Sequence, residues 1–248
     1  MAKKKSRLAL IDFIRGVAVI NMILYHALWD MVYIFGEDIP LFKTQWAYLW
    51  QQCICWCFIF LSGFSMNLGR KSYKRGALVF AGGLAVTAVT LIAMPENRIV
   101  FGVLTLLGSC MMIMTALSKI TEKMKPSVGF VLSMLLFTLT RNINEGFLGF
   151  ETIRLVPLPK ALYSGYVSTF FGFTVDGFYS ADYFSLFPWI FLFAAGYFAF
   201  HTIKAQDRLG FAQRSISTVV EFIGKQSLWI YLAHQPIIYL VLTIIYSI

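Results

Sequence analysis

Residues 8–35 read LALIDFIRGVAVINMILYHALWDMVYIF, an apolar stretch interrupted by Asp12, Arg15, His26 and Asp30. A helix needs about 20 apolar residues to cross a bilayer, so this stretch predicts a transmembrane helix. Ionisable groups at membrane depth are costly, and they usually face a bundle interior or a wet cavity that serves as a pathway or reaction site. We therefore expect this helix to line a solvated cavity.

The spacing of these four side chains places them on one stripe of the helix. At about 100° per residue, the eleven steps from Arg15 to His26 end about 20° past three full turns. Asp12 and Asp30 each fall about 60° from Arg15, on the same side. From Asp12 to Asp30 the helix rises about 27 Å, close to the thickness of a hydrocarbon core. The stripe predicts a polar tunnel wall between the two membrane faces.

The composition is typical of a polytopic membrane protein. Of the 248 residues, 58% are hydrophobic and only 13% are charged, and the mean hydropathy is +0.71. A soluble domain could not bury so much apolar surface. Backbone groups in lipid must be satisfied within the segment, so the spans must be helices. We predict an all-α membrane helix bundle with about seven transmembrane helices, at residues 8–35, 46–68, 76–94, 99–118, 127–140, 184–203 and 226–247, of which the fifth is the shortest.

The Lys and Arg residues set the orientation of this bundle. With the N-terminus in the cytoplasm, 15 of them lie inside and five outside, and the Lys/Arg excess marks the cytoplasmic side. The N-terminus is therefore predicted to be cytoplasmic and the C-terminus external. The basic excess is mostly a topology signal, and nucleic-acid binding is disfavoured because no soluble domain exists to carry it. Residues 1–7 are basic like the start of a signal peptide, but the long, charged stretch that follows predicts an uncleaved first helix.

No internal repeat divides the chain, so residues 1–248 are predicted to form a single multi-pass domain in the cell membrane. The longest connection is the outer loop 141–183, which is rich in Gly and Pro. Within it, residues 161–174 are apolar and aromatic but too short and Gly-rich for a clear span. A loop of about 40 residues is usually functional or partly structured. We expect a re-entrant or capping segment, with Asp176 and Asp182 making the outer mouth acidic.

The densest basic patch is the inner loop 69–76, which contains Arg70, Lys71, Lys74 and Arg75. One interpretation is an orientation signal that also attracts anionic headgroups. The other is a docking patch for a polyanionic cytosolic ligand, since guanidinium groups suit phosphates. No metal site is predicted, because alternate cysteines such as those at 53, 55 and 57 point about 200° apart on a helix.

The first helix offers two pairs of side chains that can meet. Asp30 follows His26 at i+4, and a carboxylate that holds one imidazole nitrogen leaves the other free as a base. A packed, satisfied pair is the alternative. Asp12 and Arg15, at i and i+3, form either an intrahelical pair that lowers the insertion cost or an anion contact at the inner mouth.

The last helix places Ser227, Tyr231 and His234 on one face, before Pro236. His234 is about 12 Å from the inner end of this helix, and His26 is about 27 Å from Leu8. We therefore expect the two histidines at different depths, sharing neither a metal nor a proton. His234 is interpreted either as a packing residue or as part of a ligand tunnel.

Several stretches occur in the order found in one known family. They are Arg7–Gly16 (RLALIDFIRG), His26–Asp30 (HALWD), Phe60–Ser65 (FLSGFS), Phe101–Leu104 (FGVL), Asp182–Trp189 (DYFSLFPW) and Ser227–Pro236 (SLWIYLAHQP). Together they resemble the heparan-α-glucosaminide N-acetyltransferase-like transmembrane family, which is similar to the acyltransferase-3 superfamily.

The resemblance implies an enzyme that takes an acyl group, typically acetyl from cytosolic acetyl-CoA, and delivers it to an acceptor across the membrane. It assigns His26 as base or acyl carrier and Asp30 as its orienter. Asp182 and Trp189 would shape the outer acceptor site. The approach of the thioester would be lined by Arg15, Ser62, Arg70, Lys71, Lys74, Arg75 and His234.

The predicted function is an integral membrane acyltransferase that acts on an amine or hydroxyl of a sugar or envelope glycan. The expected partners are the lipid bilayer, an acyl-CoA and that acceptor, and a homo-oligomer is left open. One alternative is a proton-coupled transporter that uses His26, Asp30 and Asp182 as a relay, although two similar halves with broken helices are not evident. Another is a non-catalytic membrane subunit.

Overall fold

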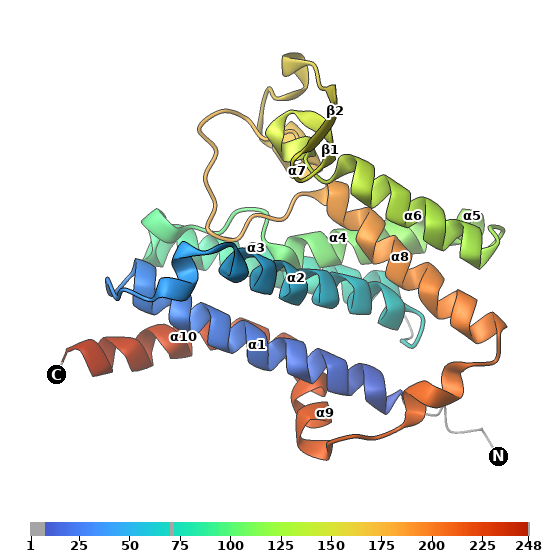
Figure 1. Cartoon of the computed structure of the whole chain (residues 1–248), viewed down its shortest axis with the longest axis horizontal. Helices are drawn as coiled ribbons and strands as arrows, with labels where there is room; N and C mark the ends of the chain where they lie inside the picture. The colour runs from blue at the N-terminus through green and yellow to red at the C-terminus, as the bar shows by residue number, and fades with distance from the viewer. Residues whose placement is uncertain (1–7, 70–71, 248) are drawn as a thin grey trace. The chain divides into compact units, whose positions relative to one another are not determined.

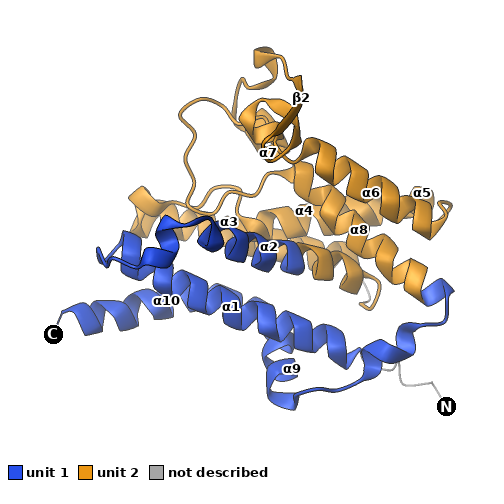
Figure 2. Ribbon diagram, viewed as in Figure 1, with its two compact units in different colours: residues 1–58, 204–248 blue, residues 59–203 orange. Residues whose placement is uncertain are grey.

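The computed structural model describes residues 8–69 and 72–247. The chain packs as two compact units, coloured separately in Figure 2. Unit 1 comprises residues 1–58 and 204–248, and unit 2 comprises residues 59–203. The prediction of one domain stays a prediction, and each unit is described by itself below.

Unit 1 is built around the long first helix, α1. It contains α1 (Ala9–Tyr33), η1 (Pro40–Lys43), the first part of α2 (Gln45–Met66), η5 (Leu209–Gln213), α9 (Thr218–Lys225) and α10 (Ser227–Tyr246). Both α9 and α10 pack against α1, as can be followed in Figure 1. Near the start of α1, a Cβ on Gly16 would lie 2.0 Å from the carbonyl oxygen of Val220, and one on Gly224 would lie 1.9 Å from that of Asp12. The two glycines therefore let α9 approach α1 backbone to backbone.

Unit 2 contains the end of α2 and the remaining helices and strands. These are α3 (Ser72–Ala93), η2 (Pro95–Asn97), α4 (Val103–Ala116), α5 (Ser118–Thr121), α6 (Pro126–Thr140), η3 (Ile143–Glu145), β1 (Phe147–Phe150), β2 (Ile153–Pro157), η4 (Lys160–Leu162), α7 (Tyr166–Phe171) and most of α8 (Leu186–Ala205). The two strands form an antiparallel hairpin in which Phe150 pairs with Ile153.

Glycines also set the packing of the helices in unit 2. On α3, a Cβ at Gly76 would lie 2.9 Å from the Met111 side chain, and one at Gly83 would lie 2.6 Å from Thr105, so α3 and α4 run antiparallel at close range. At the end of α2, Gly63 lies against the backbone of Phe193 in α8. Small residues allow such close approaches where lipid gives no hydrophobic drive for helix association.

Six helices of the described residues are long and apolar enough to cross a membrane, which confirms a multi-pass helix bundle. The fifth predicted span is one of them, because α6 and the turn after it extend over Pro126–Glu145. The short span is the fourth instead. It appears as α4, which has 14 residues and is about 21 Å long.

The entry to α4 explains its short length. Thr105 lies opposite Gly83, the eleventh step along α3, so α4 begins well inside the span of α3 rather than at its outer end. The chain before α4 is not helical, and a second loop pairs with it. The backbone N–H of Ala181 donates to the carbonyl of Arg98, and that of Phe184 donates to the carbonyl of Phe101. Irregular backbone at membrane depth requires such partners.

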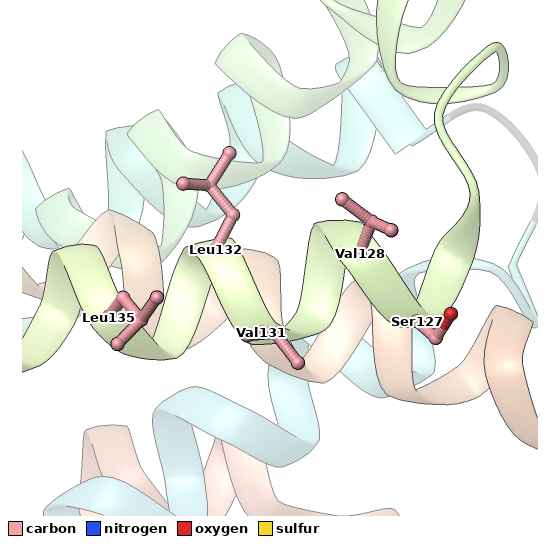
Figure 3. Close-up of a pocket in the computed structure, with 5 residues that line it drawn as sticks. All are labelled: Ser127, Val128, Val131, Leu132 and Leu135. Carbon is pink, nitrogen blue, oxygen red and sulfur yellow. The ribbon is translucent and has the colours of Figure 1, made fainter.

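The outer face of α6 carries a shallow hollow of about 420 Å³, drawn in Figure 3. It is lined only by side chains of this one helix: Ser127, Val128, Val131, Leu132 and Leu135. Val128, Val131 and Leu135 are each more than half exposed. Apart from the Ser127 hydroxyl the hollow is apolar, as the surface of a lipid-facing helix is.

Candidate functional site

Two histidines from different helices meet inside unit 1. The ring of His26 on α1 lies edge-to-face on the ring of His234 on α10, with centroids 4.9 Å apart and planes at 64°. His234 is buried and His26 is half-buried. The prediction that these histidines lie at different depths is therefore wrong.

The reason is the short helix α9 (Thr218–Lys225), which the sequence analysis did not predict. Gly224 at the end of α9 lies against Asp12 and Gly16 of α1. The following helix α10 starts at Ser227, so its first residue lies near the level of Gly16 and not at the inner end of α1. From these starting points, His26 is about 15 Å along α1 and His234 about 11 Å along α10. The two rises differ by about 4 Å, less than one helical turn, and the side chains span this difference.

The hydrogen bond of His234 defines which of its nitrogens can act as a base. Its Nδ1 lies 2.6 Å from the carbonyl oxygen of Tyr231, and a carbonyl oxygen only accepts. Nδ1 therefore carries the hydrogen, and in the neutral ring Nε2 holds the lone pair. This is the tautomer-fixing contact that the sequence analysis assigned to Asp30 and His26.

Asp30 has a different partner from the predicted one. Its residue is fully buried, and the side-chain Nε2 of Gln235 donates to Oδ1 at 2.8 Å and to Oδ2 at 2.9 Å. No hydrogen bond joins Asp30 to His26 within the described residues, so the predicted i, i+4 pair is not formed. The Asp30 carboxylate instead links α1 to α10 through Gln235, the residue that follows His234. In the sequence, the only indication of a functional role for Gln235 is its position between His234 and Pro236.

Aromatic side chains pack next to His26 of the histidine pair. The Tyr25 ring lies 6.0 Å from that of His26, and it also contacts Phe42 and Trp50, each at 5.4 Å. The indole N–H of Trp50 on α2 donates to the Asn21 side chain at 3.0 Å. These contacts restrict the rotation of the α1 side chains and so hold the histidine pair in place.

Near the inner end of α1, Arg15 and Asp12 form the expected i, i+3 ion pair. The guanidinium nitrogen lies 3.3 Å from the Asp12 carboxylate, and Asp12 is buried. This geometry is that of an intrahelical pair that lowers the cost of placing both charges in a span. A ligand contact for Arg15 remains a prediction.

The remaining residues predicted to contact the acyl donor belong to unit 2 or lie outside the described residues. Ser62 is half-buried on α2, and Lys74 and Arg75 are exposed on the first turn of α3. The Arg75 guanidinium folds back onto the backbone of Gly69. Arg70 and Lys71 lie outside the described residues. A phosphate contact for Lys74 and Arg75 stays a prediction.

The two predicted acceptor residues have well-defined packing roles in unit 2. The Asp182 carboxylate accepts from the backbone N–H of Val103 at 3.4 Å, which caps the start of α4. Trp189 is buried at the head of α8, where it packs on Phe137 and Phe184. The Arg141 guanidinium lies 5.2 Å from the Trp189 ring. Contact with an acceptor remains a prediction for both residues.

A network of polar side chains holds the outer connection together beside Asp182. The Asn144 amide donates to the Thr174 and Ser185 hydroxyls, both at 3.2 Å, and the Tyr183 hydroxyl donates to the Thr169 carbonyl. This network orders the predicted loop 141–183, together with the β-hairpin and α7. A re-entrant or capping role for this loop stays a prediction.

No group of three or more potential metal ligands occurs within the described residues. The chemistry available to unit 1 is that of two contacting imidazoles and a buried, amide-bound carboxylate. Neither a curated protein nor a solved structure matches the chain. The model of the heparan-α-glucosaminide N-acetyltransferase catalytic domain, however, matches residues 7–236. This multi-pass membrane chain belongs to the family of that N-acetyltransferase catalytic domain.

Proposed function

We propose that this protein takes an acetyl group from acetyl-CoA on the cytosolic side and transfers it to an amine or hydroxyl of a sugar or envelope glycan on the outer side. His26 acts as general base or acyl carrier. The observation that carries the proposal is the contact between His26 and His234, because two titratable rings meet within membrane-spanning helices. Such groups are expensive in a membrane and are usually functional.

Two routes fit this histidine pair. In direct transfer, a neutral imidazole of the pair removes a proton from the acceptor as its nitrogen or oxygen attacks the thioester carbon. In the two-step route, His26 attacks first, so that an N-acetyl bond forms and the C–S bond breaks. The acceptor nitrogen or oxygen then attacks the acetyl carbon, the bond from that carbon to His26 breaks, and the acceptor proton returns to the imidazole. The proton lost by the nucleophile ends on the leaving thiolate, which gives free CoA.

His234 is suited to hold the proton during either route. Its Nδ1–H is engaged by the Tyr231 carbonyl, so its Nε2 is the basic nitrogen. The buried Asp30 carboxylate supports the pair by binding Gln235, the residue next to His234 in α10. In this proposal Asp30 and Gln235 are positioning residues that fix α10 against α1 at the reacting groups.

The proposed binding site for acetyl-CoA is based on the positively charged side chains near the cytosolic face. The pantetheine arm of acetyl-CoA is long enough to enter a membrane cavity while its phosphates stay in the cytosol. Guanidinium and ammonium groups are the usual partners of phosphates. We propose that the phosphates and the arm contact Arg15, Ser62, Arg70, Lys71, Lys74, Arg75 and His234.

The acceptor side is proposed to include Asp182 and Trp189. Asp182 sits at the start of α4, where the chain is irregular and where sugar hydroxyls or an amine would find a carboxylate. An indole face is a common platform for a sugar ring, since it is large and amphipathic. An acceptor in contact with Trp189 would have to displace part of its packing on Phe184.

Purified protein in nanodiscs, incubated with acetyl-CoA labelled in the acetyl group, tests the proposal. We expect label to appear on the protein or on an added amino sugar, together with release of free CoA, and we expect both to be lost in His26→Ala. A control variant, Thr138→Val on α6, removes a hydroxyl that bonds only its own helix and should retain the activity.

Absence of acetyl-CoA binding, label transfer and thioester hydrolysis in the intact protein would contradict the proposal. Proton-coupled uptake by liposomes under those conditions would instead support a transporter. Unchanged transfer in both His26→Ala and Asp30→Asn would move the reaction away from this site.

A further inference from the structure

The segment that joins α8 to α10, residues 206–226, has a fixed place relative to the membrane. Both flanking helices are long and apolar enough to span a bilayer, so the segment begins and ends at the same membrane face. The Lys/Arg distribution assigns this face to the cytosol. We call residues 206–226 the inner-surface segment. It contains η5 and α9.

The helix α9 presents three distinct faces. Val220 and Gly224, at i and i+4, lie against α1. Val219 and Phe222 fall on the opposite side at about 60° from each other, and they are 69% and 61% exposed. Thr218 and Lys225, also exposed, lie between these faces. The helix is therefore amphipathic even after its contact with α1 is accounted for.

Two further apolar side chains of the inner-surface segment, which precede α9, are also exposed. Phe211 and Ile216 are each 55% exposed. With Val219 and Phe222 they give four large apolar side chains on a short segment at the membrane surface. An exposed apolar patch of this kind marks a surface that is covered in the working protein.

The charges of the segment indicate what covers it. Arg208, Arg214 and Lys225 are exposed. The acidic Glu221 is turned inward, where its carboxylate accepts from the Ser215 hydroxyl at 2.6 Å and from the backbone N–H of Ile216 at 3.1 Å. The outward surface therefore combines apolar side chains with cations. That combination is typical of helices that lie in the interface and bind anionic lipids.

We infer that α9 and the loop before it form an in-plane anchor, in which Phe211, Ile216, Val219 and Phe222 enter the inner leaflet and Arg208 and Arg214 bind anionic lipid headgroups. The anchor acts on the helix that carries His26, because α9 contacts α1 backbone to backbone at Gly16. The inference concerns lipid binding alone and stands or falls independently of the proposed acetyl transfer.

Lipid retention provides the first test. The full chain is placed in nanodiscs of phosphatidylcholine with one-third phosphatidylglycerol, then released and examined by native mass spectrometry. The variant Arg208→Gln/Arg214→Gln should retain several-fold less phosphatidylglycerol than the unaltered protein. The control Lys119→Gln/Lys123→Gln removes two exposed cations from another connection and should retain it fully. Equal losses in both variants would overturn the headgroup assignment.

Depth provides the second test, with one label at a time on the same helix. In a Cys53→Ala background, which removes the exposed native thiol, Val219→Cys and Lys225→Cys, which lie about 120° apart around the helix, are labelled with a bimane fluorophore. Lipids brominated on their acyl chains should quench the label at 219 strongly and the label at 225 weakly. Weak, equal quenching at both positions in folded protein would show that α9 does not enter the leaflet and would overturn the inference.

Discussion

Some polar side chains of the helices bond their own helix and others join two helices, and the two units offer an example of each. In unit 2, the hydroxyls of Thr87, Ser109 and Thr138 donate to carbonyls four residues earlier in their own helices. In unit 1, Asp30 binds Gln235 and His26 contacts His234, each across two helices. A hydroxyl that bonds its own helix can sit on any face, whereas an interhelical contact exists only while two helices hold one relative position.

Hydroxyls that bond their own helix place no demand on neighbouring helices. Side chains with interhelical contacts require a second helix in a defined position. Both units use glycine to bring helices together, at Gly16 and Gly224 in unit 1 and at Gly76 and Gly83 in unit 2. Only unit 1, among the described residues, uses such a contact to bring two titratable side chains together inside the spans. Packing alone does not need histidine and aspartate there, so the polar cluster of unit 1 is the part that calls for a functional explanation.

The largest effect should come from removing one ring of the histidine pair. His26→Ala should lower the rate of acetyl transfer by about 10²- to 10⁴-fold, the usual contribution of a general acid or base. Thr138→Val should stay within about twofold of the unaltered rate, since its hydroxyl serves only α6. Initial rates of transfer from labelled acetyl-CoA are measured for both variants. Similar rates would contradict a catalytic role for the histidine pair of unit 1.

The carboxylate contact should give the next largest effect. Gln235→Leu leaves the buried Asp30 without its donor and should lower the free energy of unfolding by about 2–3 kcal/mol. Asp30→Asn in the same protein should recover part of this loss, because no buried charge remains to be satisfied. A double-mutant cycle of thermal unfolding in nanodiscs measures the coupling. Purely additive losses would mean that the two side chains do not depend on each other.

Two adjacent glycines of α3 offer a matched test of packing in unit 2. A Cβ at Gly83 would lie 2.6 Å from Thr105, whereas a Cβ at Gly82 would meet only Leu104 at an ordinary 3.9 Å. Gly83→Ala should therefore lower the free energy of unfolding by about 1–3 kcal/mol, as overpacking usually does, and Gly82→Ala should be neutral or slightly stabilising. Equal melting temperatures for the two variants would show that α4 does not pack on α3 at this range.

The smallest effect is a pH dependence that arises outside the spans, at the start of α9. The hydrogen bond from Ser215 lowers the pKa of Glu221 in the folded protein. A lowered folded-state pKa contributes stability above the ordinary carboxyl pKa, and the contribution is lost as the pH falls through the folded value. The melting temperature of the unaltered protein should thus exceed that of Glu221→Gln near neutral pH, and the two should converge below about pH 4. A constant difference across this range would contradict the assignment.

The sequence predicted the helix bundle well because hydropathy and backbone satisfaction act locally along the chain. Helical periodicity also places Asp12, Arg15, His26 and Asp30 along one helix, α1, while the tunnel that they were expected to line stays a prediction. Arg15 and Asp12 were paired correctly for the same reason.

Contacts between helices could not be obtained in this way. The depth of His234 depended on where α10 begins, and that start depends on the contact of Gly224 with Asp12 and Gly16. The partner of Asp30 was equally out of reach, because i+4 spacing favours His26 while the packed helices offer the Gln235 amide. Helical periodicity thus identified the polar residues of α1, whereas the packing of the helices determined their partners.

We propose that acetyl transfer takes place at the histidine pair of unit 1. A density map of the protein bound to a non-hydrolysable acetyl-CoA analogue tests this proposal most directly. We expect the carbonyl carbon of the analogue within about 4 Å of the His26 ring, next to His234. Density that places this carbon elsewhere, with both rings still packed together and no ligand beside them, would contradict it.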